Sequence, residues 1–229
     1  MLVGAGIASL AVIVAGYLIV IAARGGRIPV ALAAAVTAGI MTVQLILASR
    51  GVLAEWDRTP PPILVVIGLS VLFAIAVGVS RAGTRMVDRL PFVALIAYQS
   101  FRLPLELLMH RAVTIGLMPP QMSYSGLNFD ILSGALAIPI AAMAAVDRAP
   151  RWLLLLWNLL GTVLLVNIVV IAAVSTPVFA AFGPDRLNTW IAEAPYIWLP
   201  GVLVPSAAFG HLLVWRKLLR GSLTARAES

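Results

Sequence analysis

The chain has 229 residues, of which 62% are hydrophobic and only 11% are charged. Soluble domains carry about 25% charged residues, so this composition excludes a soluble protein and indicates an integral membrane protein. The net charge of +7 comes from basic residues between the apolar segments. Basic residues in such positions set membrane topology and meet anionic lipid, so we expect the lipid bilayer and no nucleic acid as partner.

Seven apolar segments are long enough to cross a bilayer, which takes about 20 residues. Proline, glycine or charged residues punctuate the short connections between them. The sequence therefore predicts one domain (1–229), an all-α bundle of seven transmembrane helices. The predicted spans are 2–23, 28–48, 62–79, 91–118, 129–146, 152–174 and 196–219.

The predicted orientation follows from the positions of lysine and arginine between the spans, because cytoplasmic loops carry an excess of both. Three arginines, Arg50, Arg58 and Arg186, fall on one side, and eleven basic residues fall on the other. We therefore expect the N-terminus outside and the C-terminus in the cytoplasm.

Polar residues in the second and sixth spans are candidates for a buried site. Gln44 lies in the second span and Asn158 in the sixth. Such residues commonly form hydrogen bonds between helices, and they are also able to complete a polar cavity. The last span contains Pro200 and Pro205, so we expect it to be bent.

The fourth span carries the most informative pattern. Gln99, Arg102, Glu106 and His110 are spaced by three, four and four residues, which places them on one face of a helix. Arg102 and Glu106 flank Pro104 near the middle of the span, and charges at that depth normally face a protein interior or a water-filled cavity. The sequence predicts an Arg102–Glu106 ion pair there.

The loop after the fourth span is polar and, up to Asp130, uncharged. Asn128 is able to cap the fifth helix while Asp130 favours its first turn. Alternatively, four polar residues form an outer vestibule above the fourth span: Gln121, Tyr124, Asn128 and Asp130.

Several chemistries are excluded or disfavoured. Retinal needs a lysine inside the last span, but the only lysine, Lys217, lies at its cytoplasmic end. The two histidines, His110 and His211, are placed by helix rise in different layers of the membrane, so one haem cannot bridge them. The chain has no cysteine and no hydrolase or nucleotide motif. We therefore expect no metal and no cofactor, although a haem held by one histidine stays open.

Three functions remain open. In the first, the protein binds or conducts a small polar or anionic solute, or protons. Arg102 then selects charge, Glu106 is its counter-ion or proton carrier, and Gln99 and His110 are further ligands. In the second, the Arg102–Glu106 pair is structural in a sensory or assembly protein that binds a membrane subunit or a second copy. The third is an intramembrane acid–base enzyme that uses Glu106 and His110.

Three short segments carry a family resemblance: 99–102 (QSFR), 126–130 (GLNFD) and 196–200 (YIWLP). They resemble a bacterial family of multi-pass membrane proteins that has no assigned activity, over about residues 99–219. The resemblance implies location in the bacterial inner membrane and assigns no site residue.

Overall fold

The computed structural model describes the backbone of residues 2–227 and the side chains of residues 2–220. Within this part of the chain the regular secondary structure is entirely helical. The long helices are α1 (Leu2–Arg24), α2 (Val30–Ser49), α3 (Pro62–Val79), α6 (Arg102–Thr114), α7 (Ile131–Ala145), α8 (Arg151–Val174) and α9 (Val204–Ala227). Shorter helices are α4 (Arg81–Arg89) and α5 (Phe92–Ile96).

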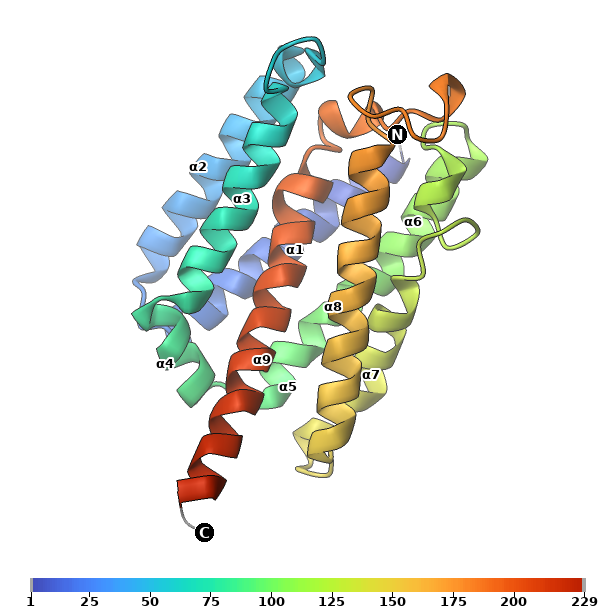
Figure 1. The fold of residues 1–229 in the computed structure, drawn as a ribbon. Helices are drawn as coiled ribbons and strands as arrows, with labels where there is room; N and C mark the ends of the chain where they lie inside the picture. The colour runs from blue at the N-terminus through green and yellow to red at the C-terminus, as the bar shows by residue number, and fades with distance from the viewer. Residues whose placement is uncertain (1, 228–229) are drawn as a thin grey trace.

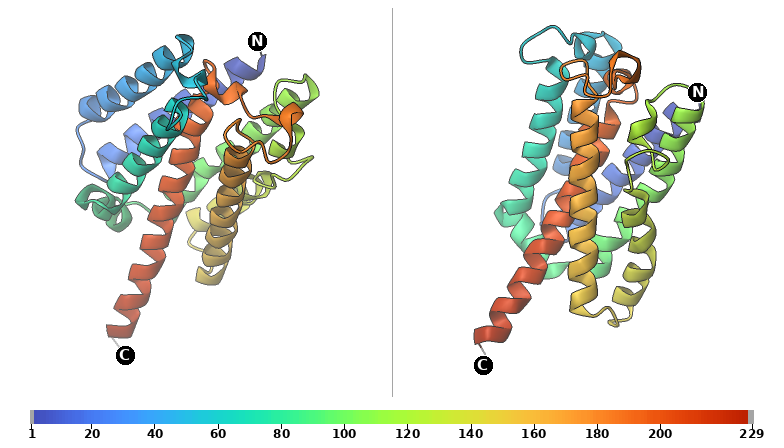
Figure 2. Two further views of the ribbon diagram at one scale, coloured as in Figure 1. Left: turned by 45° about the horizontal axis from the view of Figure 1, so that its top comes forward. Right: turned by 45° about the vertical axis from the view of Figure 1, so that its right-hand side comes forward.

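The helices run between two ends of the bundle (Figure 1). The α2–α3 connection and the segments 115–130 and 175–198 lie at one end with the start of α1; we call this the loop end. Helix α4 and the last part of α9 lie toward the opposite end. Helix α1 crosses the bundle obliquely (Figure 2), and α9 packs against both α3 and α8.

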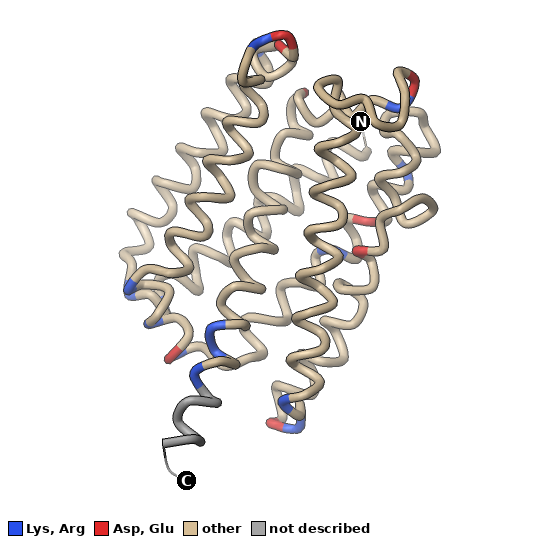
Figure 3. The backbone as a smooth tube through the Cα atoms, in the orientation of Figure 1, with Lys and Arg blue, Asp and Glu red and all other residues tan. Residues whose placement is uncertain are grey.

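Six helical stretches in the described residues are long and apolar enough to cross a membrane. They are Leu2–Arg24, Val30–Ser49, Pro62–Val79, Phe92–Thr114, Arg151–Val174 and Leu199–Arg220. The prediction of an all-α, multi-pass membrane protein is therefore confirmed. Charged residues gather at the two ends of the bundle and only a few lie at middle depth (Figure 3).

The prediction of seven spans differs from these six in the fifth predicted span, 129–146. The helix found there, α7, is shorter than predicted. Helix α7 has 15 residues, which at ~1.5 Å per residue gives about 22 Å, less than the ~30 Å hydrocarbon core. The helix begins only at Ile131, because the side chains of Asn128 and Asp130 are engaged with Glu106 and Arg102. The seventh span and the orientation of the bundle in the membrane stay predictions.

The fourth predicted span is continuous but irregular. Residues Ala97–Phe101 form a 3₁₀ turn between α5 and α6, just before Pro104, and the Ser100 hydroxyl donates to the Ala97 carbonyl at 2.7 Å. A 3₁₀ turn has 3.0 residues per turn instead of 3.6. Residues three apart eclipse in such a turn, so it changes the angular positions of the residues before Arg102 relative to an unbroken α-helix.

The last span is interrupted, as its two prolines predict. A π-helical turn at Leu199–Leu203 precedes α9. Pro205 has no backbone N–H to donate to the Gly201 carbonyl. The side chain of Gln44 on α2 supplies a donor instead, with Nε2 3.2 Å from that carbonyl oxygen.

Candidate functional site

Arg102 lies at the centre of a buried polar cluster, and its side chain is 1% exposed. Its guanidinium binds both carboxylate oxygens of Asp130, with Nε 2.7 Å from Oδ2 and Nη2 paired with Oδ1. This bidentate geometry is the strong form of an arginine–carboxylate pair. The first residue of α6 is thereby tied to the residue that precedes α7.

The other guanidinium donors also have partners. Nη1 donates to the Ser133 hydroxyl at 2.8 Å and contacts His211 Nε2 at 2.7 Å. Nη2 lies 3.4 Å from the Gly161 carbonyl oxygen. Each of the three guanidinium nitrogens of Arg102 thus donates to a protein group, and the partners come from α7, α8 and α9.

The contact with Arg102 determines the tautomer of His211. An arginine only donates hydrogen bonds, so His211 Nε2 must accept. The ring proton then lies on Nδ1, which donates to Asn158 Oδ1 at 2.7 Å, while Asn158 Nδ2 donates to the His211 carbonyl at 3.2 Å. Asn158, a predicted site residue, therefore acts on Arg102 through the imidazole.

Two glycines allow this close packing. A Cβ at position 161 would lie 2.7 Å from the Ser133 hydroxyl, and one at position 134 would lie 2.5 Å from the Leu103 nitrogen. Both distances are too short for an ordinary contact. Gly134 and Gly161 thus permit α7 and α8 to approach α6 and the Arg102 cluster.

Glu106 does not belong to the Arg102 ion pair, so the predicted pairing of these two residues is wrong. Its carboxyl oxygens accept from Asn128 Nδ2 at 2.8 and 2.9 Å. Two physical reasons account for the difference. An arginine that precedes a glutamate by four residues is the less favourable order on a helix, and the fold brings Asp130 into bidentate contact.

Asn128 links the Glu106 carboxyl group to the backbone of the segment that precedes α7. Its Nδ2 also donates to the Met122 carbonyl at 3.1 Å, and its Oδ1 accepts from the Asp130 backbone nitrogen at 3.0 Å. Asp130 is the N-terminal flanking residue of α7 but makes no side-chain capping bond. The sequence offers Asn128 or Ser125 as the cap, whereas the residue that flanks the helix is Asp130, whose carboxylate binds Arg102.

The remaining predicted residues lie apart from Arg102. Gln99 Nε2 donates to the Ala207 carbonyl at 3.0 Å, and Gln44 Nε2 donates to the Ser70 hydroxyl at 3.0 Å. Gln121 Nε2 donates to the Ser175 hydroxyl at 3.0 Å. Gln99 thus makes its hydrogen bond to α9 and none to Arg102.

His110 stacks on Tyr124 with ring centroids 4.6 Å apart, toward the loop end. Its Nδ1 lies 3.4 Å from the Ser125 hydroxyl. The two residues therefore contact each other and neither takes part in the cluster around Arg102. Whether Gln121, Tyr124, Asn128 and Asp130 form a vestibule stays a prediction.

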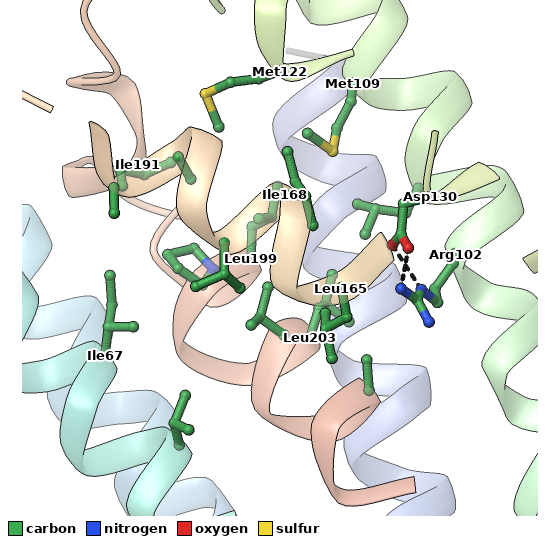
Figure 4. A pocket seen from close by; sticks show the side chains of 18 of the residues that line it. Ile67, Arg102, Met109, Met122, Asp130, Leu165, Ile168, Ile191, Leu199 and Leu203 are labelled. Carbon is green, nitrogen blue, oxygen red and sulfur yellow. Dashed lines mark hydrogen bonds and ion pairs between the residues drawn. The ribbon is translucent and has the colours of Figure 1, made fainter. Parts of the chain in front are cut away.

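A cavity of about 120 Å³ adjoins Glu106 and the Arg102–Asp130 pair. Figure 4 shows this pair at one side of the cavity, with apolar side chains across from it. The walls come from α3, the α5–α6 segment, α8 and the π-helical turn, and Met122 and Ile191 lie toward the loop end. Apolar lining residues include Ile67, Leu105, Met109, Leu165, Ile168, Leu199 and Leu203.

A second, larger cavity of about 330 Å³ lies between α1, α2, α3 and α9. Its wall is also apolar, and the hydroxyls of Ser70 and Ser206 in it donate to carbonyls of their own helices. No charged side chain lines this cavity, so the cavity beside Glu106 is the chemically richer of the two. Among the side chains described, those of residues 2–220, no three histidine, aspartate or glutamate residues come close enough to hold a metal ion.

Comparison with protein-family models, with curated proteins and with solved structures gives no match to this chain. No family is therefore identified for this chain.

Proposed function

We propose that this multi-pass membrane protein binds a small, largely apolar molecule from the membrane in the cavity beside Glu106. One observation carries the proposal: an apolar cavity with a carboxyl group at its edge. Ligand sites are typically concave and apolar with a few placed polar groups. Val169 on α8 lines the cavity and is also exposed on the outside of the bundle, so the cavity adjoins the lipid-facing surface.

The Arg102 cluster supports a structural role for this residue. A polar or anionic solute that binds Arg102 would have to displace Asp130 from a bidentate, buried pair. Breaking such a pair costs about 3–5 kcal/mol. The geometry therefore favours binding beside the cluster over conduction of an anion or of protons through it.

The other functions that the sequence left open receive less support. Glu106 and His110 have separate partners, Asn128 and Tyr124, so an acid–base pair has no geometric support. The assembly alternative also gives Arg102 a structural role. In that alternative the protein binds a membrane subunit or a second copy of itself. Location in the bacterial inner membrane with the N-terminus outside is part of our proposal.

Photolabelling in bilayer nanodiscs tests the proposal. A short alcohol that carries a diazirine group is activated by light, and the labelled residues are mapped by mass spectrometry. We expect labels on Met109, Met122 and Leu165, and their suppression by excess n-hexanol. Labels confined to lipid-exposed side chains such as Leu156 and Val166 would refute the proposal.

A matched pair of variants controls for nonspecific labelling. Ala173→Leu places extra carbon atoms at a position that lines the cavity, so it should reduce labelling there. Val170→Leu adds one methylene group on the exposed side of the same helix and should leave labelling unchanged. Equal effects of both changes would contradict binding in the cavity.

A further inference from the structure

The carboxyl group of Glu106 is unusual among the buried charged groups of this protein. It lines the cavity and its side chain is 1% exposed. A single protein nitrogen, Asn128 Nδ2, donates to it. A carboxylate has about four lone-pair sites, so acceptor capacity is left over. In the described residues, no lysine, arginine or histidine forms an ion pair with it.

The nearest guanidinium cannot supply the missing donor. Arg102 also lines the cavity, but its nitrogens donate to Asp130, Ser133, His211 and Gly161. The charge of Arg102 is matched by that of Asp130. With Glu106 ionised, the cavity wall therefore carries one unmatched negative charge, and a buried carboxylate without a cation is strongly disfavoured.

Asn128 holds this carboxyl group in place. Its amide is bound on both sides, because Nδ2 also donates to the Met122 carbonyl and Oδ1 accepts from the Asp130 backbone nitrogen. Residues on opposite sides of Asn128 thus fix the amide, and the amide fixes the position of Glu106. A preorganised acceptor needs little further ordering when a ligand binds.

The cavity limits the size of the ligand. Its volume is about 120 Å³, and an engineered apolar cavity of about 150 Å³ in another protein holds one benzene molecule. A group of about five carbon atoms therefore fits. A longer chain would have to extend past Val169 toward the lipid.

We propose that the ligand is a lipophilic amine: a protonated amino group that binds Glu106, attached to a short apolar chain or ring that fills the cavity. This inference rests on the proposed function and adds the class of head group. The amine supplies the donor and the positive charge that Glu106 lacks. The apolar walls accept the carbon atoms, whereas a carboxylate head would be repelled by Glu106.

Competition against the diazirine alcohol tests the head group. Three competitors with equal chains are used in nanodiscs: n-hexylamine, n-hexanol and n-hexanoate. Each is titrated against wild type and Glu106→Gln, and the ratio of the two half-inhibition concentrations is taken, because partition into lipid then cancels. A hydrogen bond to a charged group is stronger than a neutral one, so we expect n-hexylamine to lose about ten-fold or more in the variant.

The other competitors give a smaller or an opposite response. n-Hexanol loses a hydrogen bond to a charged acceptor but no opposite charge, so it should lose less than n-hexylamine. n-Hexanoate should improve in Glu106→Gln because a like charge has been removed. Continued competition by n-hexanol also shows that the variant keeps its fold. An unchanged n-hexylamine ratio would overturn the amine proposal and leave cavity binding intact. Failure of every competitor in wild type would instead refute the proposed function itself.

Discussion

Neutralising Asp130 should destabilise the protein strongly. Asp130→Asn removes the negative charge beside Arg102. Both residues are buried, with Arg102 1% exposed and Asp130 5% exposed. It also places an amide donor against a guanidinium donor, since both Asp130 oxygens accept from Arg102. The hydrogen bonds to Ser133 and His211 remain, but they leave the charge unmatched. We expect a loss of about 3–5 kcal/mol in the free energy of unfolding.

A double-mutant cycle measures the interaction between Arg102 and Asp130. Arg102→Met removes the buried charge that Asp130→Asn leaves behind, so the double variant should lose less than the sum of the single losses. A coupling of about 2–3 kcal/mol is expected. The corresponding coupling between Arg102→Met and Glu106→Gln should be clearly smaller, because those residues form no ion pair in this structure.

The assay is equilibrium unfolding in mixed micelles, followed by tryptophan fluorescence. Arg58→Ala is the control, because Arg58 and Glu55 form a largely exposed ion pair and such pairs contribute about 0–1 kcal/mol. Additive losses for Arg102 and Asp130, or a larger coupling with Glu106, would refute our assignment of the buried pair.

Two further predictions concern backbone packing and capping, and both are measured by the same unfolding assay. Gly161→Ala should cost about 1–3 kcal/mol, because the new methyl group overlaps the Arg102 cluster at His211. The matched change Gly68→Ala, where nothing lies within 4 Å, should stabilise its helix by about 0.5–1 kcal/mol; equal losses at both sites would contradict the packing argument. Ser80→Ala should cost about 1 kcal/mol, because the Ser80 hydroxyl accepts from two backbone nitrogens at the start of α4. An unchanged unfolding free energy for Ser80→Ala would show that this cap is replaceable by water.

Composition and apolar length were sufficient to predict the helices that cross the membrane, because these properties are local. They were also sufficient to predict that Arg102 is buried. They were not sufficient for the helix ends, as α7 shows. Its start depends on Asp130, whose side chain binds Arg102 from 28 residues away in sequence.

His211 is the clearest residue that sequence analysis missed. Helix rise was used only to separate it from His110, and the two histidines do have different partners. The same rise places His211 near the depth of Arg102, and its Nε2 lies 2.7 Å from Arg102 Nη1. The sequence did contain a signal for the acidic partner of Arg102, because a buried arginine requires an acid. Asp130 is the acidic residue beside the next apolar segment.

The partners of Arg102 have a consequence for biosynthesis. A ribosome completes the segment that contains Arg102 before it makes Asp130, Ser133, Gly161 and His211. An arginine at the centre of an isolated helix costs about 2.5–3.5 kcal/mol on insertion scales. The nascent chain therefore holds an unneutralised cation until Asp130 is made 28 residues later, and the partners Gly161 and His211 arrive only with the C-terminal third. Release of this segment from the translocon should consequently be delayed until the helices that follow are able to enclose it.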